Sequence, residues 1–209
     1  MKQRSIERDI QGFCGWDYLQ KLIGACKCLR DRGIISGLFI TGCRVSELTQ
    51  LKCENVYFGV VSEPKIILFR DVPVLKRYSR KEKKRLIEYR TFPVRIDEPP
   101  VKHFLEYFNS VGAGPLFPYT RVRIFQIVRE VGSRVGGRVP FSLINGDELY
   151  PHWFRAQRAR QLRHDYKFTD EELRDWFGWK AASTGMPSIY GKMSWMELAE
   201  KMGVKIIKW

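Results

Sequence analysis

Three segments decide the fold class: V-Y-F-G-V-V (residues 56–61), K-I-I-L-F (65–69) and E-Y-R-T-F-P-V-R-I (88–96). Each is rich in β-branched and aromatic residues, and Ser62-Glu63-Pro64 and a basic stretch interrupt the run. This pattern predicts a three-stranded antiparallel sheet. The basic stretch, residues 75–85, is expected as a solvated loop at the tip of the hairpin between the second and third strands.

Helical patterns lie on both sides of these strands. Apolar residues recur at the spacing of one helical face over residues 16–29, 31–40, 45–51, 101–108 and 122–131. Pro151 suits the first position of a further helix. Thr169 with Glu172 and Ser194 with Glu197 are capping-box pairs, which predict two short helices. The expected fold class is therefore α+β: a mostly helical domain with a small three-stranded antiparallel sheet.

Length and charge limit the function classes. A chain of 209 residues with 44% apolar content is expected to form one domain over residues 1–209, with an N-terminal extension or linker (1–15) and a C-terminal tail (194–209). Lys and Arg outnumber Asp and Glu by 37 to 23, and the net charge of +14 favours a polyanionic partner. Charge alone does not separate DNA from RNA, an anionic membrane or a ribosome.

The sequence contains no apolar run of the roughly 18 residues that a membrane span requires, and no secretory signal, so a cytoplasmic, DNA-associated location is expected. The cysteines are odd in number and include no C-x-x-C pair, which argues against a zinc site. Cys26 shares a helical stripe with Leu19, Leu22 and Ile23, which is typical of a buried apolar side chain.

Three motifs carry chemistry: G-C-R-V-S-E-L (42–48), H-W-F-R (152–155) and W-K-A-A-S-T-G-M-P-S-I-Y (179–190). His152 and Arg155, three residues apart on a helix, share a face and can act on one ligand. A guanidinium binds two phosphate oxygens in a fork, and an imidazole can move a proton near neutral pH. Two arginines on one phosphate can neutralise the charge of a five-coordinate transition state, as a metal ion does elsewhere.

In this order, the motifs resemble those of the tyrosine recombinase (phage integrase) family, and the spacing of W…S-x-M-P-x-x-Y is more similar to that of archaeal integrases. The resemblance covers about the whole chain and implies the catalytic-domain fold of that family. It assigns catalytic roles to Arg44, His152, Arg155, Trp179 and the nucleophile Tyr190, with Glu47 as acidic support. Trp179 stands where most members have His, and an indole can only donate a hydrogen bond. No metal or cofactor is implied.

The resemblance also implies a lysine at the hairpin that protonates the leaving 5′ oxygen. Lys76 directly follows the second predicted strand and is the first choice, while Lys83 and Lys84 are alternatives because the hairpin is long. Contacts to the DNA backbone are expected from Arg77, Arg80 and Arg158.

The function expected from this resemblance is a site-specific recombinase or integrase that cleaves and rejoins duplex DNA through a 3′-phosphotyrosyl intermediate, without metal or ATP. Its partners would be duplex DNA that carries a recombination or attachment site, and further copies of itself in a tetrameric synapse. Two alternatives stay open: a type IB topoisomerase and a non-catalytic DNA-binding protein. Family members usually carry a separate N-terminal domain that clamps the duplex, and none is expected here. The tail is expected to pack on a neighbouring protomer or on its own domain.

Overall fold

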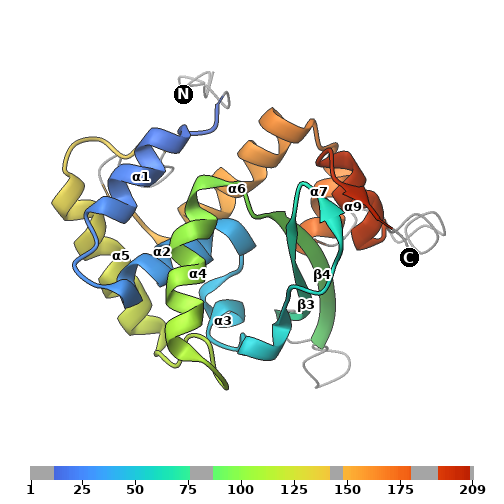
Figure 1. Cartoon of the computed structure of the whole chain (residues 1–209). Coiled ribbons are helices and arrows are strands. Elements are labelled where there is room, and N and C mark those ends of the chain that lie inside the picture. The colour runs from blue at the N-terminus through green and yellow to red at the C-terminus, as the bar shows by residue number, and fades with distance from the viewer. Residues whose placement is uncertain (1–11, 76–86, 142–147, 180–192, 208–209) are drawn as a thin grey trace, which may run out of the picture.

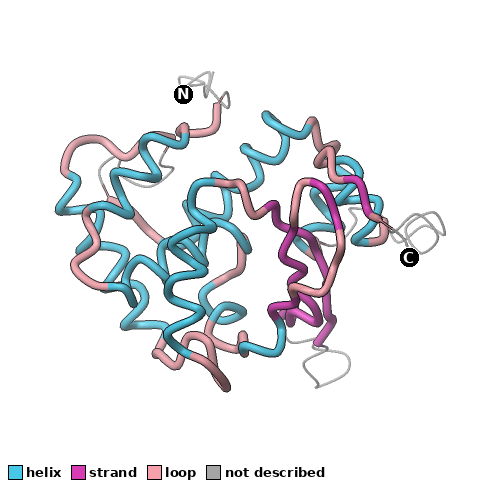
Figure 2. Tube along the Cα trace, in the orientation of Figure 1, coloured by secondary structure: helices cyan, strands magenta, loops and turns pink. Residues whose placement is uncertain are grey.

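The computed structural model describes residues 12–75, 87–141, 148–179 and 193–207. Within these ranges, helices surround a small antiparallel sheet (Figures 1 and 2). The helices are α1 (Trp16–Gly24), α2 (Leu29–Thr41), α3 (Val45–Leu48), a 3-10 turn η1 (Cys53–Asn55), α4 (Pro99–Val111), α5 (Arg121–Val135), α6 (Pro151–Tyr166), α7 (Asp170–Phe177) and α9 (Trp195–Lys201). The strands are β1 (Val56–Tyr57), β2 (Ser62–Glu63), β3 (Ile66–Leu75), β4 (Ile87–Arg95) and β5 (Lys205–Ile206).

The main sheet of the described residues has the order β1-β3-β4, and all its pairings are antiparallel. β3 and β4 pair from Ile66↔Arg95 to Leu75↔Ile87, with a break in register between Phe69 and Val72. The α+β class and the three-stranded antiparallel sheet are therefore confirmed. The first strand is shorter than expected, because only Val56–Tyr57 of the segment 56–61 pairs with β3.

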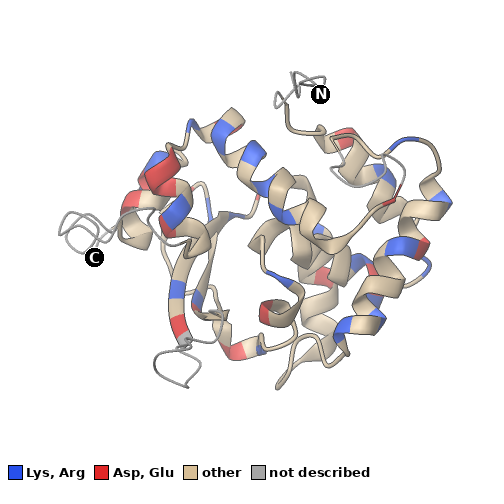
Figure 3. Cartoon of the chain, turned by 180° about the vertical axis from the view of Figure 1, so that it is seen from behind, with Lys and Arg blue, Asp and Glu red and all other residues tan. Residues whose placement is uncertain are grey.

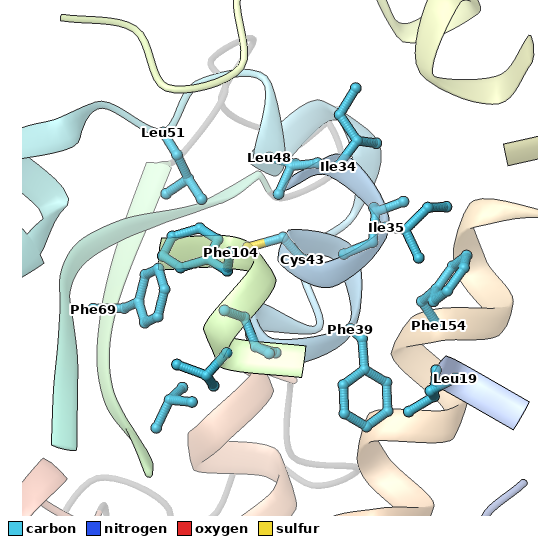
Figure 4. Packing of buried hydrophobic residues seen from close by; sticks show 14 of the residues in the cluster. Leu19, Ile34, Ile35, Phe39, Cys43, Leu48, Leu51, Phe69, Phe104 and Phe154 are labelled. Carbon is cyan, nitrogen blue, oxygen red and sulfur yellow. The ribbon is translucent and has the colours of Figure 1, made fainter. Parts of the chain in front are cut away.

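The core lies between the sheet and the central helices. Phe69 of β3 stacks on Phe92 of β4, with ring centroids 5.3 Å apart, and lies 5.6 Å from the Phe104 ring of α4. Every residue of α2 from Gly33 to Thr41 is buried, so this helix runs through the centre of the domain (Figure 4). Its C-terminal end is consequently held rigidly by packing on all sides.

Both predicted capping boxes are present. Thr169 Oγ1 accepts a hydrogen bond from the Glu172 backbone N–H at 3.3 Å, and Glu172 Oε2 accepts one from the Thr169 N–H at 2.5 Å. Ser194 and Glu197 form the same reciprocal pair at the start of α9. The caps satisfy N–H groups that a helix start leaves without intrahelical partners.

The described part of the tail packs on its own chain. β5 pairs with β2 through Ser62↔Ile206 and Glu63↔Lys205, and Arg95 Nη1 donates a hydrogen bond to the Met202 carbonyl at 3.0 Å. α9 lies against β4 at the edge of the main sheet (Figure 1). Of the two placements expected for the tail, the one on its own domain is the one observed for residues 193–207.

Residues 12–15 also pack on the domain. The Cys14 backbone N–H donates to Gln157 Oε1 at 2.9 Å, and the Phe13 ring meets the Trp16 ring edge-on at 4.9 Å. The five cysteines are free thiols, and Cys26 is buried as the sequence predicts. No helix among the described ranges combines the length and apolar character needed to cross a membrane.

Candidate active site

Arg44 lies at the N-terminus of α3, directly after the turn at Gly42 that ends α2. Glu47, in the first turn of α3, accepts hydrogen bonds from the Arg44 backbone N–H at 2.9 Å and from Arg44 Nη1 at 2.7 Å. The Glu47 side chain is fully buried, whereas the Arg44 side chain is 42% exposed. The buried carboxylate therefore holds one end of the guanidinium and leaves the rest of it accessible.

Arg155, in the first turns of α6, lies close to Arg44 and Glu47, and it is only 1% exposed. Its Nη1 donates to the Gly42 carbonyl at 2.6 Å, and its Nη2 donates to the Phe177 carbonyl at 3.1 Å. Glu47 Oε2 lies 3.5 Å from Arg155 Nη1. One buried carboxylate thus contacts both Arg44 and Arg155, which are 111 positions apart in the sequence.

The Nε–H of Arg155 is buried and has no hydrogen-bond acceptor among the described residues. Burial and the neighbouring Arg90 guanidinium lower the pKa of Arg155 to about 9, against the opposing effect of Glu47. The side chain is still charged at neutral pH. Because buried donors normally have a partner, this N–H is a candidate donor to a bound anion.

His152 lies one helical turn before Arg155 and is exposed at the surface of α6. The surrounding protein still removes part of its ring from water, and this partial burial, followed by the charges of Arg155 and Arg44, lowers the pKa of His152. Nearby cations disfavour the imidazolium form. His152 is therefore neutral at pH 7 and can accept a proton.

Trp179 follows α7 and packs over Arg155. Its ring stacks on the Phe177 ring with centroids 4.8 Å apart, and the Arg155 guanidinium carbon lies 4.7 Å and 5.6 Å from the centroids of the Phe177 and Trp179 rings. Trp179 is 38% exposed, so it lines the surface of the site. Cation–π attraction to these two aromatic faces stabilises the buried guanidinium of Arg155.

Arg44, His152, Arg155 and Trp179 all line one cavity of about 680 Å³. The cavity continues along a stripe of α6, and its other lining residues are Gly12, Phe13, Ala156, Ala159, Arg160, Arg163, His164 and Leu173. Lys and Arg positions repeat along α6 and α5 in Figure 3. The structure therefore brings together the four predicted catalytic residues that it describes, in a surrounding suited to an anion.

Six other predicted residues lie outside the described ranges. They are the nucleophile Tyr190, the lysines Lys76, Lys83 and Lys84, and the DNA contacts Arg77 and Arg80. Their roles stay predictions.

The prediction that Arg158 contacts the DNA backbone is wrong. Arg158 is fully buried, and its Nη1 donates to Glu98 Oε2 at 2.6 Å and to Gln161 Oε1 at 2.7 Å. Tyr166 donates to the other oxygen of Glu98 at 2.9 Å. Arg158 faces inward because it shares the buried stripe of α6 with Phe154 and is packed against Glu98, so it links α6 to the start of α4.

Arg90 is part of the site region, and the sequence analysis missed it. It is 3% exposed; Nη2 donates to the Thr41 carbonyl at 3.1 Å and to Cys43 Sγ at 3.3 Å, and Nη1 donates to the Trp176 carbonyl. The strand pattern could have indicated that Arg90 is buried. Arg90 lies two residues before Phe92 and four before Val94, and alternate residues of a strand share a face, so Arg90 is on the same face as these apolar residues.

Within the described ranges, no three His, Cys, Asp or Glu side chains are grouped so that they could hold a metal ion. The polar side chains that line the cavity are arginines, histidines and the Trp179 indole, which suits a phosphate or another oxyanion. A scan against protein-family models found no match for this chain, and a search of curated proteins found none either.

Proposed function

We propose that this protein is a tyrosine recombinase-type DNA strand transferase, a site-specific recombinase or integrase, and that the cavity of Arg44, His152, Arg155 and Trp179 binds the scissile phosphate. The observation that carries the proposal is the convergence of these four residues, from three distant segments, on one cavity, with Glu47 in contact with both arginines. The motif order in the sequence supports the same function.

The two arginines differ in how they would hold the phosphate. Arg155 is fixed by the Gly42 and Phe177 carbonyls, and its Nε–H, which has no acceptor among the residues that the structure describes, would donate to an oxygen of the ligand. Arg44 is held by Glu47 on one side and is accessible on the other. Donors that are fixed before the reaction stabilise developing negative charge without further reorganisation, and each contributes about 10²- to 10³-fold to the rate.

The proposed reaction is a transesterification. The Tyr190 phenol oxygen forms a bond to phosphorus while the bond from phosphorus to the 5′ oxygen breaks, and a 3′-phosphotyrosine results. His152, neutral at pH 7, takes the phenol proton. A hairpin lysine, Lys76 or its alternatives Lys83 and Lys84, gives a proton to the 5′ oxygen. The second step reverses these transfers on a new 5′ hydroxyl, so the number of phosphodiester bonds is conserved and no energy source is consumed.

Covalent capture tests this function without knowledge of the target site. Purified protein is incubated in EDTA with duplexes that carry a randomised core and a nick close to each possible cleavage point. The short fragment that carries the released 5′ hydroxyl then dissociates, which prevents religation, and protein–DNA adducts accumulate. We expect an adduct whose DNA is attached through its 3′ end, and its loss in Tyr190→Phe. An adduct that persists in Tyr190→Phe would contradict the proposal.

The same preparation separates the recombinase from the type IB topoisomerase. A supercoiled plasmid without the captured sequence is incubated with the wild-type protein, and its linking number is followed. A recombinase is expected to relax it poorly, because cleavage depends on its site. Rapid relaxation of any plasmid would favour the topoisomerase, and sequencing of the captured ends would then show no preferred site.

A further inference from the structure

The Arg90 side chain repeats, one residue earlier, the contacts that Arg155 makes to two helix ends. Arg155 donates to the carbonyls of Gly42 and Phe177. Arg90 donates to the carbonyls of Thr41 and Trp176, the residues directly before these two. Two buried guanidinium groups therefore bridge the C-terminal ends of α2 and α7 in parallel.

Helix C-termini are suited to such bridges. The last carbonyls of a helix have no intrahelical partner and carry the negative end of the helix dipole, so a cation there is favourable. The Phe177 ring contacts both cations, with its centroid 5.8 Å from the guanidinium carbon of Arg90 and 4.7 Å from that of Arg155. The two positive charges are thus held close together, with Arg155 lining the cavity and Arg90 outside its lining.

Arg90 makes no ion pair with a carboxylate in the part of the chain that the structure describes; its partners there are carbonyls, a thiol and aromatic rings. Arg158, equally buried, is paired with Glu98. A buried charge without a counter-ion is unfavourable for stability alone. Its carbonyl partners offset only part of its positive charge, and the remainder acts on Arg155 and on an anion placed beside it.

We propose that Arg90 is a positioning residue of the active site: it fixes the two helix ends on which Arg155 rests, and it adds a buried positive charge behind the scissile phosphate. This inference rests on the proposed function. With 3% exposure, Arg90 does not reach the substrate itself. It acts through the orientation of Arg155, and a misplacement of about 1 Å at such a group reduces a rate roughly 10²-fold.

The test measures the rate of covalent adduct formation at saturating DNA, corrected for the folded fraction from near-UV circular dichroism. We expect Arg90→Met to lower this rate about 100-fold, with DNA affinity changed less than about threefold. Arg90→Lys keeps the charge but cannot bridge both carbonyls, so its rate is expected at about a tenth of the wild-type rate, above that of Arg90→Met. Arg158→Met is the matched control: it removes a buried arginine that packs on the Phe39 and Trp176 rings but donates its hydrogen bonds to Glu98 and Gln161, not to the helix-end carbonyls. Its rate per folded molecule is expected within about threefold of wild type.

A second substrate separates positioning and charge from general stability. In it, a methyl group replaces one non-bridging oxygen of the scissile phosphate, so that the phosphate is neutral and needs less positive charge. The ratio of the wild-type rate of adduct formation to the Arg90→Met rate is expected to be at least tenfold smaller on this substrate. An equal ratio on both substrates, without rescue by lysine, would overturn the inference, as would a wild-type rate in Arg90→Met. If the methionine variant does not fold, a wild-type rate in Arg90→Lys overturns it. Absence of any adduct with wild-type protein would instead contradict the proposed function.

Discussion

At the scale of single residues, the site depends on one buried carboxylate. Glu47 is fully buried, binds the backbone and side chain of Arg44, and lies beside Arg155. If its charge is removed, two guanidinium groups remain close together, one of them buried. The position of each arginine in the cavity is therefore expected to depend on Glu47.

The first prediction is that Glu47→Gln lowers the free energy of unfolding by about 3 kcal/mol, because one partner of a buried ionic contact is lost. Urea unfolding at neutral pH measures this. Glu54→Gln is the control: the Glu54–Lys52 pair is exposed on both sides, and its loss is expected to change stability by less than about 1 kcal/mol. Equal effects in the two variants would argue against the bridging role of Glu47.

The second prediction concerns pH. Partial burial, Arg155 and Arg44 lower the pKa of His152 below its usual value of 6.5, so the neutral base persists into mildly acidic solution. The acid limb of the adduct-formation rate is thus expected below pH 6.5. Arg44→Gln removes a cation that disfavours imidazolium, so the pKa of His152 rises and the limb moves to higher pH, whatever the overall rate. A pH–rate profile of both proteins checks the direction. An unmoved limb would mean that another group titrates.

Sequence reasoning predicted residues better where a motif fixed their spacing. The H-x-x-R spacing places His152 and Arg155 on one face of α6, and both line the cavity. The sequence did not indicate that Arg158 is buried while other arginines of α6 are at the surface. The burial of Arg158 depends on its contact with the Glu98 carboxylate at the start of α4, which is distant in the sequence. Arg90 was missed for a related reason: its carbonyl partners at the ends of α2 and α7 belong to distant segments.

At the scale of elements, the turn between α2 and α3 orients the site. Gly42 ends α2 in the left-handed region, with φ of 55°, and its carbonyl accepts the hydrogen bond of Arg155. A Cβ atom at this position would lie 2.3 Å from the Phe177 ring. The sequence T-G-C-R therefore needs glycine for both its backbone conformation and its close approach to α7.

The third prediction is that Gly42→Ala lowers the free energy of unfolding by about 3 kcal/mol, from left-handed strain and overpacking together. Gly203→Ala is the control, because Gly203 also has positive φ (72°), in the Schellman turn that ends α9, and an added Cβ would meet only Arg95 Nη1 at the ordinary contact distance of 3.9 Å. It should lose only about 1 to 2 kcal/mol. Thermal unfolding of the two variants measures the difference, and equal losses would show that the contact with Phe177 is easily relaxed.

Elements with local signals were predicted well, and those that need distant partners were not. The capping boxes at Thr169 and Ser194 depend on residues three positions apart, and both were found. The segment 56–61 was expected as one strand, yet pairing stops at Tyr57, and β2 pairs instead with the tail. Which strand pairs with residues 62–63 is decided about 140 positions away, so no local pattern reveals it.

The fourth prediction concerns this pairing. A chain truncated after Gly203 loses β5 and the buried Val204 but keeps α9. It is expected to unfold at a lower temperature, since β2 loses its partner and apolar area is exposed. Its oligomeric state in sedimentation velocity is expected to equal that of the full chain, because residues 204–207 pack on their own domain. Dissociation of an oligomer upon truncation would contradict this.

At the scale of the whole molecule, charge and cavity act together. The net charge of +14 favours a polyanionic partner without specifying which, and the cavity stripe along α6 adds Arg160 and Arg163 to the proposed phosphate site. Arg163 pairs with Asp170, whereas Arg160 lies over the Phe141 ring and has a buried Nη1 without an acceptor among the described residues. Arg160 is thus the better candidate for a second backbone contact.

The fifth prediction is that Arg160→Ala reduces the slope of log K against log salt concentration by about 1, the value for one lost phosphate contact. Fluorescence anisotropy with a labelled duplex between about 50 and 200 mM salt measures the slope. Arg129, on α5 and paired with Glu148, lies outside the cavity, and Arg129→Ala should leave the slope nearly unchanged. Indistinguishable slopes for Arg160→Ala and wild type would remove Arg160 from the DNA interface.

The proposed function requires that Arg44 and Arg155 bind one and the same oxyanion. A crystal structure of the full chain soaked in tungstate, with tungsten located by its anomalous scattering, tests it most directly. We expect a tungstate ion within hydrogen-bonding distance of both guanidinium groups and of the Trp179 indole N–H. Tungstate bound elsewhere on the protein while this position stays empty would contradict it.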